Sequence, residues 1–259
     1  MVRVSIDRPS LPPHKTAMWG RLPVAVLMLG LAGCAGTGAT PSNPGDPADP
    51  DEASNRAIFS TNQTLDRLFL GRTARAYNAA VPHFVRDRVH DLIVNLDLPG
   101  TFANDVLQGQ PKRAGQTLAR LAVNATAGLG GLFDPATDRF HMPSHAEDFG
   151  QTLAVWGVPR DPYWVLPVLG PSSPRDAIGL AVDIGADPLN FIHFKQHLWW
   201  EAGREYMKVL DLRARNLETL DDIERNSVDY YASMRSLYRQ LRDNEVRNGA
   251  PDTKDLPDF

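Results

Sequence analysis

The chain of 259 residues contains a single cysteine, Cys34. No second thiol is available for a disulfide, so the residues after Cys34 must be stabilised by burial. Those residues also contain no apolar run of about 18 residues, the length of a conventional membrane-crossing helix. The sequence therefore predicts a body of shorter segments that pack on one another.

Cys34 ends the tetrapeptide Leu31–Cys34, directly behind an apolar run from Leu22 to Leu31. This arrangement is similar to a bacterial lipobox, and basic residues precede it, as in a secretory signal. The prediction is a signal peptide over residues 1–33 and lipid attachment at Cys34, where several acyl chains make anchoring effectively permanent. An ordinary signal peptide with an accidental cysteine is the alternative, and Met18 is a second possible start. Ala35, rather than an aspartate, favours the outer membrane.

Composition divides the remainder into three parts. Residues 34–51 form the lipidated cysteine and a flexible tether rich in Pro and Gly, residues 52–249 form one domain, and residues 250–259 form a flexible tail. Loss of residues 1–33 removes four basic side chains and Asp7, which takes the formal net charge from −4 to about −7. This charge does not favour a nucleic-acid partner.

Apolar periodicity predicts an all-α domain of amphipathic helices with connecting loops rich in Gly and Pro. One helix is expected from Pro82 to Leu96 and a second from Pro111, with Leu118 and Leu121 on its apolar face and Arg113 and Arg120 elsewhere. Further helices are expected over Glu201–Leu217 and from Ser227 to Gly249. The best strand candidate, Tyr163–Leu169, contains Pro167 and is interpreted as an extended connection.

The stretch Asn124–Pro135 places three glycines and three large apolar residues at the end of a helix. A phosphate-binding loop is not favoured, because no GxxxxGK[ST] pattern is present and no strand precedes the turn. The apolar side chains either pack in the core or face lipid. The candidate lipid-binding or channel residues are therefore Gly128, Leu129, Gly130, Gly131, Leu132, Phe133 and Asp134.

Histidines and serines offer weaker candidates for chemistry. His141, His145, Glu147 and Asp148 crowd together, but Pro143 prevents the two histidines from sharing a helical turn, so no metal and no cofactor is predicted. Ser172 and Ser173 lack the GxSxG pattern of a nucleophile, and capping of a helix that begins at Pro174 is the preferred interpretation.

Two clusters on later helices are interpreted from composition. His193 and His197 lie among Phe191, Phe194, Trp199 and Trp200, which indicates a membrane interface or the edge of the core, with a metal pair as the remaining alternative. Arg235, Arg239 and Arg242 are predicted to form a solvated face, and contact with a headgroup or an anionic partner is the alternative.

Several phrases in a fixed order resemble one family, the MlaA (VacJ) outer-membrane lipoproteins. They are Asn55–Phe59, Asn62–Asp66, Leu107–Pro111, Asn124–Pro135, Glu147–Leu153, Trp156–Val158, Pro162–Tyr163, Leu166–Pro167, Gly170–Ser173 and Arg175–Asp176. The resemblance covers roughly residues 50–247. The chain departs from the family pattern at Ala53-Ser54 and Thr61, where aromatic residues are usual.

The resemblance implies a ring of helices in the outer membrane, associated with trimeric porins, with an amphipathic channel for phospholipids. It implies withdrawal of mislocalised phospholipid from the outer leaflet toward a periplasmic lipid-carrying protein, with an inner-membrane ATP-driven complex completing the route. No enzymatic step is expected. Two other hypotheses are a lipid-directed hydrolase that uses Ser172 or Ser173 with His145 or His193, and a porin-associated scaffold that moves no lipid.

Overall fold

The computed structural model describes residues 47–191 and 197–250. They all belong to one compact unit, Ser42–Phe259. The expected signal peptide, Cys34, His193, most of the tether and nearly all of the tail lie outside the described residues.

The described residues form helices with one short hairpin between them. In chain order the elements are α2 (Glu52–Leu65), the π-helix η2 (Asp66–Leu70), α3 (Gly71–Ala80), α4 (His83–Leu107), α5 (Pro111–Thr126), α6 (Pro135–Asp138), α7 (Phe149–Val155), β1 (Trp164–Leu166), β2 (Gly170–Ser172), α8 (Pro174–Ala186), the 3-10 helix η3 (Pro188–Phe191), α9 (His197–Arg215), α10 (Leu217–Asn226) and α11 (Tyr230–Val246). The all-α prediction is confirmed.

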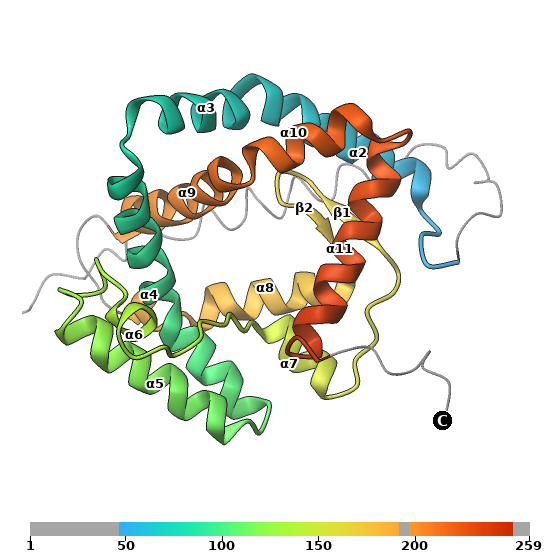
Figure 1. Ribbon diagram of the computed structural model, residues 1–259. Coiled ribbons are helices and arrows are strands. Elements are labelled where there is room, and N and C mark those ends of the chain that lie inside the picture. The colour runs from blue at the N-terminus through green and yellow to red at the C-terminus, as the bar shows by residue number, and fades with distance from the viewer. Residues whose placement is uncertain (1–46, 192–196, 251–259) are drawn as a thin grey trace, which may run out of the picture. The chain divides into compact units, whose positions relative to one another are not determined.

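The packing between these helices closes on itself. α3 packs against α9, α9 against α4, α4 against α7, α7 against α11, α11 against α10, and α10 against α3 again. Within this unit the helices therefore follow one another as a ring (Figure 1). α5 packs along α4 and α8 packs along α7, so both thicken one side of the ring.

Local chemistry explains where several helices begin. Pro111 and Pro174 occupy the first turns of α5 and α8, as predicted, because proline lacks the N–H that has no partner there. The Ser173 side chain accepts a hydrogen bond from Asp176 N at 3.1 Å, which confirms the predicted cap. Asp134, Asp148 and Asp229 cap α6, α7 and α11 in the same way.

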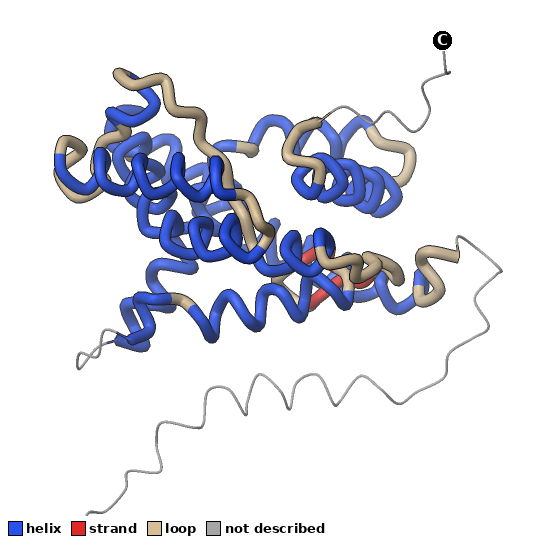
Figure 2. The backbone as a smooth tube through the Cα atoms, turned by 90° about the horizontal axis from the view of Figure 1, so that it is seen from below, coloured by secondary structure: helices blue, strands red, loops and turns tan. Residues whose placement is uncertain are grey.

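Other boundaries differ from the expectations. α4 continues through Pro99 to Leu107, and the helix expected over Glu201–Leu217 divides at Asn216 into α9 and α10. The connection expected at Tyr163–Leu169 is instead an antiparallel hairpin, with Val165 opposite Pro171. Its strands have three residues each and lie among the helices, red in Figure 2. The prediction was wrong because Pro167 lies in the turn, where its missing N–H breaks no pair.

Two asparagines of α2 bind the edge of this hairpin. They are seven residues apart and therefore lie on the same face of the helix. Asn55 donates to Tyr163 O at 3.0 Å and accepts from Val165 N at 2.9 Å. Asn62 donates to Leu166 O at 2.8 Å and accepts from Val168 N at 2.7 Å. Each side-chain amide thus replaces a backbone peptide of a neighbouring strand, so α2 satisfies the exposed edge of β1.

Replacing Asn55 with alanine is expected to lower the free energy of unfolding by about 2 kcal/mol. The substitution leaves Tyr163 O, Val165 N and the buried Asp49 without their amide partner, and an unsatisfied buried polar group costs about 1–3 kcal/mol. Denaturant unfolding of the detergent-solubilised protein measures the change. Asn244→Ala, at an exposed position on α11, is the matched control, and equal stabilities of the two variants would refute this role of Asn55.

The end of the expected tether is part of the folded unit. Asp49 is 2% exposed, and it accepts hydrogen bonds from Asn55 at 2.8 Å, Tyr231 at 2.6 Å and Arg235 at 2.5 Å. The prediction of a flexible tether as far as residue 51 is therefore wrong at Asp49. The composition indicated no burial because the segment is polar, but Arg235 neutralises the buried carboxylate.

The arginines of α11 point inward rather than forming a solvated face. Arg242 binds Asp148 through two hydrogen bonds of 2.7 and 2.8 Å and Asp176 through two of 3.1 and 3.0 Å. Its side chain is 12% exposed. Arg242 therefore joins α11 to the start of α7 and of α8, and the prediction of a solvated face was wrong.

Candidate functional site

The interior of the described unit reverses the usual pattern of a water-soluble domain, in which apolar side chains make up most of the core. Among the described residues, buried polar or charged side chains outnumber buried apolar ones. The two apolar clusters are small, one around Leu210 and Ala74 and the other around Tyr163, Val165 and Tyr231. Burial of polar groups is tolerated only when they are paired, and most of these are hydrogen-bonded.

α5 shows the reversal most clearly. Thr117, Arg120 and Asn124 are buried, whereas Leu118 is exposed. The helix was predicted correctly, and its predicted apolar face is divided, because Ala114 is buried while Leu118 is exposed. Arg120 is accommodated inside because it donates to Asp134, to Thr137 Oγ1 and to the carbonyl of Met142.

A polar network fills the interface between α4, α5 and the segment before α7. Asp105 is fully buried and accepts a hydrogen bond from Thr117 Oγ1 at 2.6 Å, and His145 Nε2 lies 3.1 Å from the same carboxylate. Glu147 lies beside Gln108 and Arg113, and burial raises the pKa of its carboxyl. This interior is held by hydrogen bonds and ion pairs rather than by hydrocarbon contacts.

Large apolar side chains are exposed on many elements of the described unit. Examples are Leu68, Phe69, Leu107, Leu118, Trp156, Val168, Leu169, Ile184, Trp199, Trp200 and Leu212. Apolar surface on this scale is typical of membrane or partner contact. Within the described ranges no helix has the length and apolar character needed to cross a bilayer.

The predicted candidate residues Gly128–Asp134 form a loop between α5 and α6. Leu129 is 68% exposed, and Leu132 and Phe133 are also exposed. Leu129, Gly130 and Gly131 have φ values of 53°, 74° and 93°, so three successive residues adopt the left-handed region. At Gly131 a Cβ atom would lie 2.3 Å from the Asn95 side chain, so the close approach to α4 requires glycine there.

Asp134 fixes the end of this loop. It accepts hydrogen bonds from Arg120 at 2.8 Å, from Asn124 at 2.9 Å and from Thr137 Oγ1 at 2.6 Å. Burial alone would raise the pKa of Asp134, but hydrogen bonds from Thr137, Asn124 and Arg120 hold it below its usual value. Asp134 is therefore an anchor for the loop rather than a free acid.

One face of α4 supports the apolar part of the loop. The Arg88 guanidinium lies 4.6 Å from the centre of the Phe133 ring and 5.2 Å from that of Phe84, and the two rings are 6.4 Å apart. The structure thus places the predicted residues on a loop that is anchored by polar contacts and exposes Leu129 and Leu132.

The other candidates for chemistry belong to separate networks. Ser173 is fully buried and caps α8, and Ser172 Oγ lies 3.4 Å from the Ser173 carbonyl. His145 contacts Asp105 and Thr117 through a single nitrogen, Nε2. Among the described residues, no group of three potential metal ligands is present.

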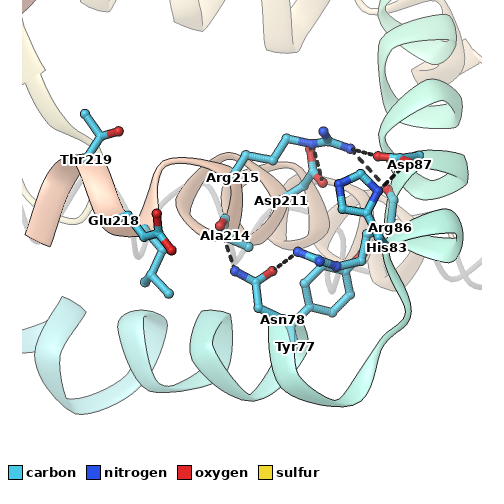
Figure 3. Close-up of a pocket in the computed structure, with 11 residues that line it drawn as sticks. Tyr77, Asn78, His83, Arg86, Asp87, Asp211, Ala214, Arg215, Glu218 and Thr219 are labelled. Carbon is cyan, nitrogen blue, oxygen red and sulfur yellow. Dashed lines mark hydrogen bonds and ion pairs between the residues drawn. The ribbon is translucent and has the colours of Figure 1, made fainter.

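A polar pocket of about 500 Å³ lies where the α3–α4 and α9–α10 connections meet (Figure 3). No motif in the sequence marks it, because its lining comes from four helices. The lining residues are Tyr77, Asn78, His83, Arg86, Asp87, Asp211, Ala214, Arg215, Leu217, Glu218 and Thr219.

Comparison with known proteins gives consistent matches over this unit. The family model described as MlaA lipoprotein matches residues 47–245. A Rickettsia bellii protein without a functional name is 33% identical over 197 residues, covering 76% of each chain.

Other relatives carry the name "Intermembrane phospholipid transport system lipoprotein MlaA". The Haemophilus influenzae protein is 29% identical over 217 residues, which cover 80% of this chain and 83% of that one. The Escherichia coli K12 protein is 29% identical over 197 residues, which cover 74% and 76%.

A solved structure from work on the "Structural basis for maintenance of bacterial outer membrane lipid asymmetry" is also similar. It has a TM-score of 0.68 and 31% sequence identity, and the match covers 76% of this chain and 98% of the other.

Proposed function

The chain belongs to the MlaA lipoprotein family, and we propose that it withdraws mislocalised phospholipid from the outer leaflet of the outer membrane, through an amphipathic channel, and so maintains lipid asymmetry. Family membership and the relatives' roles in intermembrane phospholipid transport support this proposal. The observation that carries it is the combination of a paired polar interior with many exposed large apolar side chains.

The physical reason is the barrier that a phospholipid meets in a bilayer. Its charged headgroup must leave water, and unpaired charge in hydrocarbon costs many kcal/mol. A ring of helices that lies in one leaflet, apolar outside and polar within, provides a hydrated path for headgroups. No covalent step is needed, so the proposed function is not enzymatic.

The glycine-rich loop fits this process as a contact for acyl chains. Leu129, Leu132 and Phe133 are exposed apolar side chains on a loop that Asp134 and Gly131 hold in place. We propose that Gly128–Asp134 lines or borders the lipid path. Acyl tails contact the three large side chains while headgroups stay in the polar part.

The proposed location is the periplasmic leaflet of the outer membrane, with lipid attached at Cys34. The family resemblance supports trimeric porins as neighbours and a periplasmic lipid carrier, served by an inner-membrane ATP-driven complex, as the acceptor. Aromatic side chains such as Trp199 and Trp200 suit the headgroup region, where amphipathic rings favour the interface.

Lipid analysis of the detergent-extracted protein tests the proposal. Intact phospholipid is expected to co-purify with it, and added labelled phospholipid is expected to be recovered without cleavage. Release of free fatty acid that is lost in Ser173→Ala would favour the hydrolase instead. Absence of any associated phospholipid would favour the porin-associated scaffold.

A further inference from the structure

Residues 141–148, which we call the strap, connect α6 to α7 and have no regular secondary structure (Figure 1). Side chains on one face of α5, at helical spacing, hold the strap along that helix. The contacts are Arg113 with Glu147, Gln116 with Pro143 O, Thr117 with His145 and Arg120 with Met142 O. Later residues of the strap contact earlier residues of α5, so the two segments run antiparallel. Only the contacts of His145 and Glu147 involve titratable groups of the strap.

The titratable end of the strap joins a buried charge cluster. The side chains of Asp105, on α4, and of Glu147 are 0% and 1% exposed, so water solvates neither carboxylate. Arg113 is the arginine between them. Its Nη2 donates to Glu147, whereas its Nε lies 3.6 Å from Asp105 and has no hydrogen-bond partner among the described residues. One arginine thus serves two buried carboxylates and reaches only one of them at hydrogen-bond distance.

The remaining contacts of Asp105 fix a proton on His145 Nε2. Thr117 Oγ1 donates to Asp105 Oδ2 at 2.6 Å, and His145 Nε2 lies 3.1 Å from the same oxygen and 3.2 Å from Oδ1. An ionised carboxylate only accepts hydrogen bonds, so Nε2 is the donor. A second proton, on Nδ1, would turn His145 into a cation beside Asp105.

The cluster lacks one positive charge. Asp105 and Glu147 carry −1 each and Arg113 carries +1, so the formal sum is −1 while His145 is neutral. An uncompensated charge in a buried site is costly, and uptake of one proton by His145 or Glu147 removes it. Burial raises the pKa of Glu147, which favours the same uptake.

Neighbouring elements supply no further cation to this cluster. On α7 the neutral Thr152 accepts from Gln108 and donates to Asn104, which in turn donates to Asp183 of α8. That chain of hydrogen bonds therefore ends on another carboxylate. The charged groups closest along α5 and the strap are already paired with one another or with α11, and these pairs are Arg120 with Asp134 and Asp148 with Arg242.

We propose that Asp105, Arg113, His145 and Glu147 form a proton-dependent latch, which holds the strap on α4 and α5 while the cluster carries one extra proton and releases that end at alkaline pH. The folded protein then holds a proton that the unfolded chain has lost to water, so its stability falls as the pH rises. The other end stays attached, because Gln116 and Arg120 bind backbone carbonyls, which do not titrate.

Cleavage after Glu147 by a glutamate-specific protease tests the latch in the detergent-solubilised full chain. Glu147 is 8% exposed in the closed strap, so cleavage there requires release. Asp105→Asn removes one carboxylate and with it the need for the extra proton. The shape is retained, and the new amide can donate to Thr117 Oγ1, which has Arg113 O at 3.1 Å as an alternative acceptor.

The ratio of the two cleavage rates cancels the protease's own pH dependence. The wild type is expected to be cut at the same rate as Asp105→Asn at pH 6 and at least about tenfold faster at pH 9, the factor that corresponds to one pKa unit. Asp222→Asn removes a carboxylate that is 60% exposed on α10 and is expected to be cut like the wild type at both pH values.

Two results would overturn the latch. One is equal cleavage of the wild type and Asp105→Asn at pH 9, and the other is a difference of the same size at pH 6, which would show a structural effect without titration. Denaturant unfolding of the wild type decides the matter if Asp105→Asn does not fold. Its unfolding equilibrium constant is expected to rise at least about tenfold from pH 6 to pH 9, and a constant value would overturn the latch.

Discussion

Cells that carry Leu129→Asp together with Phe133→Asp are expected to withdraw phospholipid from the outer leaflet at least about tenfold more slowly than wild-type cells. An aspartate costs about 2.5–3.5 kcal/mol in an apolar membrane segment, and two of them on one loop would expel acyl chains from it. The rate is measured as the disappearance of a fluorescent phospholipid inserted into the outer leaflet of intact cells.

The loop variant needs a control for charge and for folding. Val228→Asp together with Leu241→Asp adds the same two charges at exposed apolar positions outside the loop, and this pair is expected to leave the rate within about twofold of the wild type. Equal protein abundance shows that loss of the Phe133 contact with Arg88 has not unfolded the chain. An unchanged rate in the loop variant would remove Gly128–Asp134 from the lipid path.

Replacement of Arg242 with glutamine is expected to lower the free energy of unfolding by about 3–5 kcal/mol. The guanidinium binds Asp148 and Asp176, and the Asp176 side chain is only 9% exposed. Removal of the guanidinium leaves the buried Asp176 carboxylate with Arg175, at 3.0 Å, in place of two arginines, and takes from Asp148 its arginine partner. Denaturant unfolding in detergent, followed by circular dichroism, measures the loss.

Arg225→Gln is the matched control for this substitution. Arg225 pairs with Asp222 on the surface of α10, where the two side chains are 69% and 60% exposed. Exposed pairs contribute about 0–1 kcal/mol, so this variant is expected to unfold almost like the wild type. Equal stabilities of Arg242→Gln and Arg225→Gln would show that α11 is not held by Arg242.

Acid titration gives an independent readout of the same contact. Burial alone would raise the pKa of Asp176, but Arg242 lowers it to about 2, and the pKa of Asp148 is lowered in the same way. A carboxyl with a lowered folded-state pKa contributes stability above its unfolded value of about 4, and the contribution is lost as the pH falls toward 2. The wild type is therefore expected to lose stability between pH 4 and pH 2, and Arg242→Gln is expected to lose less over that interval.

The elements of the fold were largely predictable because their signals are local. Pro111 and Pro174 fix the starts of α5 and α8, and Ser173 caps the second of them. Periodicity identified α4, although it could not identify its end, since the pattern weakens after Leu96 while packing against α7 and α9 continues. Local rules describe a helix well when its own residues decide its boundaries.

Local rules did not predict which face of each helix is buried. Periodicity shows that Leu118 and Arg120 lie on different faces of α5, but it does not show which face meets solvent, lipid or protein. An inward Arg120 depends on Asp134 and Met142, which approach only after the loop has folded back. The same holds for Arg242, whose partners on α7 and α8 precede it by 94 and 66 residues.

The polar pocket and the asparagine contacts of α2 had no sequence signal for a related reason. Tyr77 and Glu218 line one pocket only because two helix connections lie together, and Asn55 reaches β1 across 108 residues. The loop Gly128–Asp134 could be proposed from the sequence because glycines and large apolar residues lie within a few positions. Its anchoring by Asp134 and its support by α4 required the three-dimensional structure.

The most direct measurement is the amount of phospholipid in the outer leaflet of the outer membrane, determined by surface digestion of intact cells with an added phospholipase. Cells that lack this protein are expected to show a severalfold rise over the wild type, and expression of the full chain is expected to restore the low level without any increase in free fatty acid before digestion. The same low level with and without the protein would contradict the account.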